Sequence, residues 1–303
     1  DVLTSRGLGD VYKRQTIMLI NANPLLLAIL ASFFFALSTF ISKLIGMGLV
    51  GDPIHPLQVS HARFGFGLVG ASLLLLYSSK NFSHPNFKLH LLRCTLGWLG
   101  VSILFTGVIY IPAANAVALS FMNPIFAMIF ALYILKEKID IYRWAAVAIS
   151  FCGAVILIRP EGGEFNIIAF LCLLGAAAFG LEIIIIKILS VTEDIFQIIF
   201  FNNLIGVLIA TIPLFYIAKP PSSLQWFLLA NVGFTMIIGQ VLFLLAIKVS
   251  QASLITPYIY STIIFIVMLD WIILQNNPGL WSILGASLII CAGAYTAYRA
   301  NAH

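Results

Sequence analysis

Stretches of about 20 apolar residues recur along almost the whole chain, separated by short polar breaks. A helix needs roughly that many apolar residues to cross the hydrocarbon core of a bilayer. Of the 303 residues, 61% are hydrophobic and only 9% are charged, which no soluble domain sustains. The runs are apolar on every face, unlike the alternating strands of a membrane barrel. The chain is therefore expected to be an all-α polytopic membrane protein.

Ten transmembrane helices can be placed, and together they consume nearly the whole sequence. The expected ranges are 24–44, 57–77, 92–111, 113–135, 142–158, 167–189, 195–217, 225–247, 252–274 and 279–298. The longest connections, around residues 46–56 and 78–91, are too short to hold a water-soluble domain. Any functional site is therefore expected among the helices.

Lys and Arg residues are distributed unequally between the two sides of the membrane. With the N-terminus inside, twelve of them fall on the inner side and only Lys43, Arg159 and Lys219 on the outer side. Because basic residues near span ends stay preferentially in the cytoplasm, both termini are predicted to be cytoplasmic, in the inner (plasma) membrane. The net charge of +5 is then explained by topology and by attraction to the membrane surface, and nucleic acid is not an expected partner.

Residues 1–17 are expected to be a non-native or disordered extension. The segment DVLTSRGLGDVYKRQ has no apolar periodicity, and the hydrophobic chain begins only after Met18, where native translation is expected to start. The alternative, a cleaved signal peptide, is disfavoured because the first apolar run exceeds the roughly 7 to 15 residues of a signal-peptide core.

Sequence features recur with a period of five spans. The segments AAVAISFCGAV at 145–155 and GASLIICAGAY at 285–295 occupy equivalent places in the fifth and tenth spans. The tight third-to-fourth connection at Pro112 likewise matches the tight eighth-to-ninth connection near Ser250. These features indicate two five-helix repeats, 18–160 and 161–303, and because five is odd the second must be inverted. Inverted repeats are typical of alternating-access transporters that bind substrate near the midplane.

Longer segments carry a resemblance to a known family. They are YIPAANAVALSFMNPIFAMIFALYILKEKIDIYRWAAVAISFCGAVILIRP in the first half, and GQVLFLLAIKVSQASLITPYIYSTIIF and WSILGASLIICAGAYTAYR in the second. They resemble the EamA repeats of the drug/metabolite transporter (DMT) superfamily. The resemblance implies a ten-helix transporter of small organic metabolites with cytoplasmic termini and a central cavity. The segment TPYIYST is similar to the subgroup that contains S-adenosylmethionine and riboflavin uptake carriers, which does not fix the substrate.

The chain departs from this family pattern at the end of the fourth helix of the repeat. Glu137 fits the Glu of the usual Gly-Glu pair in the first half. In the second half, Asn276 stands where Glu is usual and Asp270 stands where a small residue is usual. The two halves are therefore expected to be chemically unequal at matching ends.

Three classes of function are compatible with these features. We expect a secondary transporter that moves a small organic metabolite, amino-acid-like or nucleoside- or cofactor-like, by alternating access. Transport would be facilitated or ion-coupled, because the sequence holds no ATP-binding motif. A membrane-embedded enzyme and a non-transporting scaffold or channel are the alternatives. The expected partners are the metabolite and membrane lipid, with a proton or other coupling ion and a second copy of the chain left open.

No enzyme, metal or cofactor motif is found in the sequence. The four cysteines lie singly in different spans, where buried apolar thiols are expected, and only His61 of the five histidines lies within a span. Catalytic residues, metal ligands and a cofactor are therefore not expected.

Two charged residues within spans are the leading site candidates, because charge is costly in lipid. Glu182, in FGLEIIIIKIL, shares a helix face with Gly175 and Ala178 and is expected to have no intrahelical partner. The hypothesis is that it lines the cavity and binds a cationic substrate group or carries the coupling proton; a structural acid is the alternative. Arg63 matches an Arg common in the family and either contacts anionic substrate groups or bonds helix ends or headgroups.

Other charges are expected at the ends of spans. Lys43 is expected to snorkel to the outer interface, and Arg93 and Lys187 to the inner surface. Asp270 lies about one turn from the outer end of its span, and a solvated helix end is expected there.

Uncharged polar and aromatic side chains complete the candidate site. Hydrogen bonding to a substrate, or else between helices, is expected of Asn115, Asn123, Gln240, Tyr258 and Tyr260. The two asparagines are eight residues apart and share a helix face. Stacking on a planar ligand is possible for two aromatic residues, Trp98 and Phe121. Two prolines, Pro124 and Pro257, each remove a helix donor and predict kinks.

Overall fold

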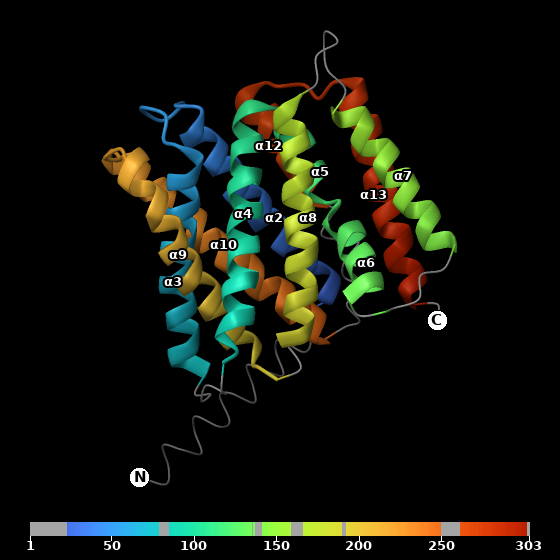
Figure 1. Ribbon diagram of the computed structural model, residues 1–303. Helices are drawn as coiled ribbons and strands as arrows, with labels where there is room; N and C mark the ends of the chain where they lie inside the picture. Colours follow the sequence, from blue (N-terminus) through green and yellow to red (C-terminus); the bar gives the residue numbers. More distant parts are fainter. Residues whose placement is uncertain are drawn as a thin grey trace.

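The computed structural model describes residues 23–78, 85–134, 136, 141–158, 166–189, 192–249 and 261–301. Within them the regular structure is entirely α-helical (Figure 1). The helices are α2 (Pro24–Gly46), α3 (Pro56–Ser78), α4 (Phe87–Tyr110), α5 (Ala113–Ser120), α6 (Asn123–Ile134), α7 (Ile141–Ile158), α8 (Ile167–Leu189), α9 (Ile195–Ile217), α10 (Ser223–Val249), α12 (Ser261–Leu274) and α13 (Leu280–Asn301). Seven described segments are long and apolar enough to cross a bilayer, and two apolar helices are shorter. The prediction of an all-α polytopic membrane protein is confirmed.

Several helix ends are shifted by one to three residues from expectation, and two of the described spans differ by more. The third begins at Phe87, five residues before the expected residue 92, because the Asn86 side chain caps it by accepting the Leu89 N–H at 3.3 Å. The fourth span is interrupted: α5 ends at Ser120 and α6 begins at Asn123. Pro124 therefore lies in the first turn of α6, where no helical hydrogen bond needs its missing N–H.

The helices pair in a pattern that a two-fold axis relates. Helix α2 of the first repeat packs against α10 of the second. The equivalent of α2 in the second repeat is α8, and it packs against α4 of the first. The contact of α12 with α2 is matched in the same way by that of α6 with α8. Two pairs, α3 with α9 and α7 with α13, join equivalent helices and form opposite edges of the bundle (Figure 1). The two repeats thus interlock along their length.

Small residues allow the close approaches within this bundle. A Cβ at Gly180 in α8 would lie 2.8 Å from the backbone nitrogen of Ala127 and 2.9 Å from the carbonyl oxygen of Asn123 in α6. Backbone atoms cannot move aside as a side chain can, so this contact requires glycine. Close packing over small residues is the usual basis of helix association in a bilayer.

The edges of the bundle present apolar surface. Cys94 and Cys172 are buried as expected, but Cys152 and Cys291 are exposed. The last two lie on α7 and α13, the pair at one edge, whose outward faces have no other helix against them. An exposed thiol on such a face is an apolar, lipid-facing group.

Candidate functional site

A cavity of about 330 Å³ lies between the two repeats. Its walls come from α2, α3, α4, α5, α6, α8, α9, α10 and α12, so helices of both repeats contribute. Its aromatic lining comprises Phe35, Phe64, Phe105, Phe121, Phe179 and Phe243, and its polar lining comprises Thr39, Arg63, Arg93, Ser120, Asn123, Glu182, Asn202, Gln240 and Thr262. A largely apolar cavity of this size with a few polar groups suits a small organic ligand.

The predicted site residues divide into three groups. Five of them line the cavity: Arg63, Phe121, Asn123, Glu182 and Gln240. Two lie on the wall helices α4 and α5 but are not among the lining residues: Trp98 and Asn115. Three lie outside the described residues: Pro257, Tyr258 and Tyr260. Residues predicted from four different spans therefore meet at the central cavity.

Glu182 has a partner that the sequence did not suggest. Its Oε1 lies 3.4 Å from Nη2 of Arg93, and the two side chains are 12% and 7% exposed. The expectation that Arg93 snorkels to the inner surface is wrong, because α4 starts early and places this residue in its second turn, facing α8 and α9. Its Nη1 also donates a hydrogen bond to the Ile198 carbonyl at 3.0 Å.

Gly97 makes the position of this carboxylate possible. A Cβ on Gly97 would lie 2.9 Å from both carboxylate oxygens of Glu182. Gly97 lies one turn from Arg93 on α4. The Glu182 carboxylate therefore packs against the glycine and pairs with the arginine on the same helix. Sequence reasoning identified the acid but not Arg93 and Gly97, since these two residues lie three spans away.

Arg63 is buried and lacks any such partner. Only 4% of the residue is exposed, and Nε and Nη1 are buried with no acceptor among the described residues. The guanidinium carbon lies 4.1 Å from the centroid of the adjacent Phe64 ring, which gives a cation–π contact but accepts no conventional hydrogen bond. The arginine therefore presents unused donors inside the molecule.

Asn202 is a lining residue that the sequence analysis missed. It is 5% exposed, and its buried Oδ1 has no hydrogen-bond donor among the described residues. Its neighbour Asn203 is satisfied within α9, where it donates to the Ile199 carbonyl at 2.9 Å. Two adjacent amides inside the apolar run IIFFNNLIGVL were the available signal.

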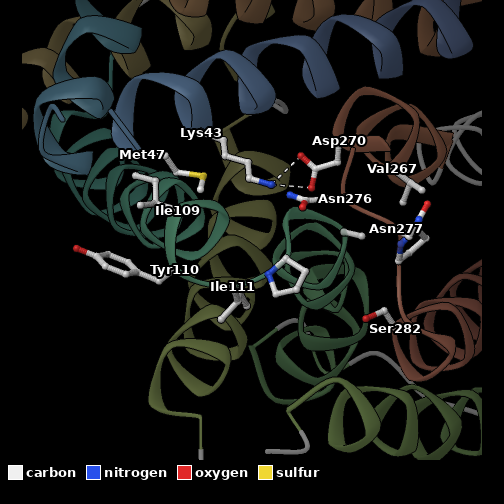
Figure 2. Close-up of a pocket in the computed structure, with 13 residues that line it drawn as sticks. Lys43, Met47, Ile109, Tyr110, Ile111, Val267, Asp270, Asn276, Asn277 and Ser282 are labelled. Carbon is white, nitrogen blue, oxygen red and sulfur yellow. Dashed lines mark hydrogen bonds and ion pairs between the residues drawn. The ribbon is translucent and has the colours of Figure 1, made fainter. Parts of the chain in front are cut away.

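A buried ion pair joins the repeats at one end of the bundle, which we call the outer end after its predicted orientation. The outer end includes the connecting residues 47–55 and 275–279. Figure 2 shows the Lys43 ammonium and the Asp270 carboxylate pointing toward one another. Nζ of Lys43 donates to Oδ1 of Asp270 at 2.7 Å and to Oδ2 at 2.6 Å. A pocket of about 310 Å³ adjoins the pair and is bordered by Tyr110, Asn276 and Ser282.

The expectations that Lys43 snorkels and that Asp270 is solvated are therefore both wrong. The two side chains are 4% and 10% exposed. Each was placed near a span end correctly, but α2 and α12 pack against each other, so the two ends face one another instead of water. Mutual neutralisation makes that burial tolerable.

A second polar cluster joins the repeats at the opposite, inner end. The carboxylate of Glu193, just before α9, lies 2.7 Å from Nε2 of His90 and accepts from Nε2 of Gln197 at 2.7 Å. The Asn86 backbone N–H donates to it at 2.9 Å. Burial raises the pKa of Glu193, but these hydrogen bonds and the adjacent His90 outweigh burial and hold that pKa below its usual value.

Comparison with known families agrees with this architecture. The EamA-like transporter family model matches the chain twice, over residues 22–159 and 166–298. The chain belongs to the EamA-like transporter family. The two matches cover the two interlocked helix sets, and the predicted resemblance to EamA repeats of the DMT superfamily is confirmed.

Characterised EamA-like relatives are transporters of small metabolites. The chain is 26% identical over 250 residues to an S-adenosylmethionine uptake transporter of Rickettsia prowazekii, covering 82% of this chain and 85% of the relative. It is 26% identical over 270 residues to the pseudopaline exporter CntI of Pseudomonas aeruginosa, covering 88% and 93%. It is 28% identical over 214 residues to a riboflavin transporter of Vibrio cholerae, covering 69% and 71%.

A solved crystal structure shares the EamA-like fold. It superposes with a TM-score of 0.61 at 15% sequence identity and covers 92% of this chain and 97% of its own. At that identity the likeness supports the architecture and not the ligand.

Proposed function

We propose that the protein is a secondary transporter that carries a small organic metabolite across the plasma membrane by alternating access. The observation that supports this most strongly is the central cavity, which helices of both repeats line and which holds polar atoms with no partner in the described part of the chain. A site between inverted repeats can be exposed alternately to either side when the repeats rock against each other. Transport is facilitated or coupled to an ion, and both termini are cytoplasmic.

The outer ion pair supports a conformation that is closed toward the outside. Lys43 lies four residues beyond Thr39 on α2, and Asp270 lies eight beyond Thr262 on α12. At a rise of 1.5 Å per residue, the pair is about 6 to 12 Å outward of these cavity residues. It thus separates the outer pocket from the central cavity, and access from outside requires it to part.

The test is uptake and counterflow by the purified full chain in proteoliposomes. The probes are a pooled library of amino acids, S-adenosylmethionine, riboflavin and nucleobases. We expect at least one compound to be exchanged across the membrane, with uptake accelerated by the same compound preloaded inside. Conduction far above carrier turnover without counterflow would point to a channel. Chemical conversion of a probe by the detergent-solubilised protein would point to an enzyme.

Two variants show whether the exchange uses the central cavity. Ser120→Phe adds a ring at a lining position of α5 and is expected to abolish exchange. Tyr216→Trp is the matched control, because this side chain is 91% exposed at the far end of α9 and the change leaves the cavity untouched. Equal exchange by both variants would contradict the proposed site.

A further inference from the structure

The membrane-embedded charges that the structure describes pair off with one exception. Lys43 is matched by Asp270 and Arg93 by Glu182, each within ion-pair distance. Arg63 is as deeply buried as these residues, yet it has no carboxylate within ion-pair distance, and its Nε and Nη1 have no hydrogen-bond acceptor among the described residues. The central cavity therefore carries one uncompensated positive charge.

An arginine cannot relieve this imbalance by releasing its proton. The guanidinium stays charged in proteins, and a charge in hydrocarbon requires a partner or water. Glu182 cannot serve as a full counter-ion, because Arg93 already holds it and Gly97 seats it on α4. Glu182 acts on Arg63 only at longer range than an ion pair, and the cavity that Arg63 lines is the route by which a closer counter-ion can reach it.

We propose that the transported metabolite is an organic acid whose carboxylate pairs with Arg63. This inference rests on the proposed transport function and names the substrate class of the same cavity. A single carboxylate balances the single unpaired charge, whereas a phosphate dianion would overcompensate it. Guanidinium and carboxylate also pair through parallel charge-assisted hydrogen bonds.

Other residues that line the cavity indicate which further groups this ligand carries. Oε1 of Gln240 and Oδ1 of Asn202 are buried acceptors that have no donor among the described residues, so the ligand is expected to offer N–H or O–H groups to them. The rings of Phe64, Phe121 and Phe179 provide apolar contact for a carbon skeleton. The class is thus a small monocarboxylate with polar hydrogens and no compensating ammonium group, such as an N-acylated amino acid.

Binding is tested by thermal unfolding of the purified full chain in detergent. The probes are N-acetylated amino acids, each beside its own carboxamide, which is uncharged and nearly equal in size. We expect at least one acid to raise the unfolding midpoint with concentration, and its carboxamide to have no effect at tenfold higher concentration. Carboxamides that stabilise as well as the acids, or acids that never stabilise, would overturn the proposal.

Variants assign the effect to Arg63. Arg63→Gln is expected to abolish stabilisation by the acid, and Arg63→Lys to retain part of it because the charge remains. Lys219→Gln is the matched control: it removes one exposed positive charge outside the cavity and should leave the shift unchanged. Acid-dependent stabilisation that survives in Arg63→Gln would contradict the assignment.

The ligand-free midpoint separates a binding role from a structural one. Since Nε and Nη1 of Arg63 find no acceptor among the described residues, Arg63→Gln should unfold at a midpoint equal to or above that of the unmodified chain. A lower midpoint in Arg63→Gln, together with loss of acid binding in Arg63→Lys, would show a structural arginine. Stabilisation by the anionic lipid phosphatidylglycerol, and by no free acid, would assign Arg63 to a headgroup and overturn the proposal.

Failure of this inference differs from failure of the transport proposal. The binding measurement needs no membrane gradient, so acid-specific stabilisation without counterflow would refute transport and leave the ligand class standing. Counterflow of neutral or cationic probes alone, unaffected by Arg63→Gln, would refute the ligand class and leave transport standing.

Discussion

Glu182 and Arg93 show how one residue's role depends on a partner three spans away. Sequence periodicity placed the acid on a face with Gly175 and Ala178, whereas in the structure it lines the cavity together with Phe179, Ile183 and Ile186 of the same helix. Periodicity could not supply Arg93, because pairing between helices is a tertiary property that the spacing along one helix does not contain. The ion pair, and the glycine that seats it, could be recognised only in the folded chain.

Replacing Glu182 by Gln is expected to lower the unfolding midpoint and to abolish transport or its pH dependence. The midpoint falls because Arg93 is left as an uncompensated buried charge, at a cost of about 3–5 kcal/mol. The double variant Glu182→Gln/Arg93→Gln removes both charges and should recover the midpoint. Recovery of the midpoint without recovery of transport would assign the acid a direct role in transport, and recovery of both would make it structural.

The lowered pKa of Glu193 predicts that the unfolding midpoint falls in acid. Its folded pKa lies below the ordinary value of 4.5, so its stabilising contribution is present above that value and is lost as the pH falls through the folded pKa. The unfolding midpoint of the unmodified chain should therefore decline below about pH 4.5. Glu193→Gln should have a lower midpoint at pH 7 and a shallower decline in acid. Parallel curves for the two proteins would show that another group controls the acid response.

At the scale of elements, the helix positions followed from apolar runs more reliably than their ends did. The range of α8 agrees with expectation, because its apolar stretch is long and sharply bounded. The early start of α4 depends on an Asn86 cap within a polar segment, which apolarity does not detect. The interruption after α5 falls inside an unbroken apolar run and was marked only by the following Pro124.

The contact between α2 and α12 predicts how the outer end opens. Lys43→Gln leaves Asp270 as a lone buried acid, which should favour conformations in which water reaches it. In a background without the native cysteines, a Thr39→Cys side chain in the cavity should then react faster with an impermeant thiol reagent added outside. The reciprocal variant Lys43→Asp/Asp270→Lys restores opposite charges and should return the rate toward that of the unmodified pair. A rate indifferent to all three backgrounds would remove the ion pair from any gating role.

At the scale of the whole molecule, duplication in the sequence indicated how the ten spans assemble. The tight connections and the matching fifth and tenth spans predicted two repeats, and the family matches fall on both. The pairing between repeats, such as α2 with α10, did not follow from the sequence, because every span is apolar all round and offers no preferred partner.

The charge distribution predicts the orientation of the whole bundle. Asp52 lies exposed at the outer end and Lys88 exposed at the inner end. In a background without the native cysteines, Asp52→Cys should react with an impermeant thiol reagent on intact cells, and Lys88→Cys should react only after permeabilisation. Gly51 is the poorer site, since its φ of +124° disfavours a side chain. The opposite labelling pattern would invert the assignment of both termini.

The outer ion pair also breaks the symmetry of an otherwise two-fold molecule. Asp270 precedes Asn276 by six residues, and the corresponding position six residues before Glu137 is Ala131, which is buried and uncharged. The Lys43–Asp270 ion pair therefore has no repeat-related equivalent, and the inner end is joined by a different set of contacts around Glu193. If the protein cycles by alternating access as proposed, its two end states should differ in free energy. For a carrier that consumes no chemical fuel, such a bias sets the dwell time in each state and makes the half-saturation concentrations on the two faces unequal. It leaves the final concentration ratio untouched, because that ratio is fixed by the gradients alone.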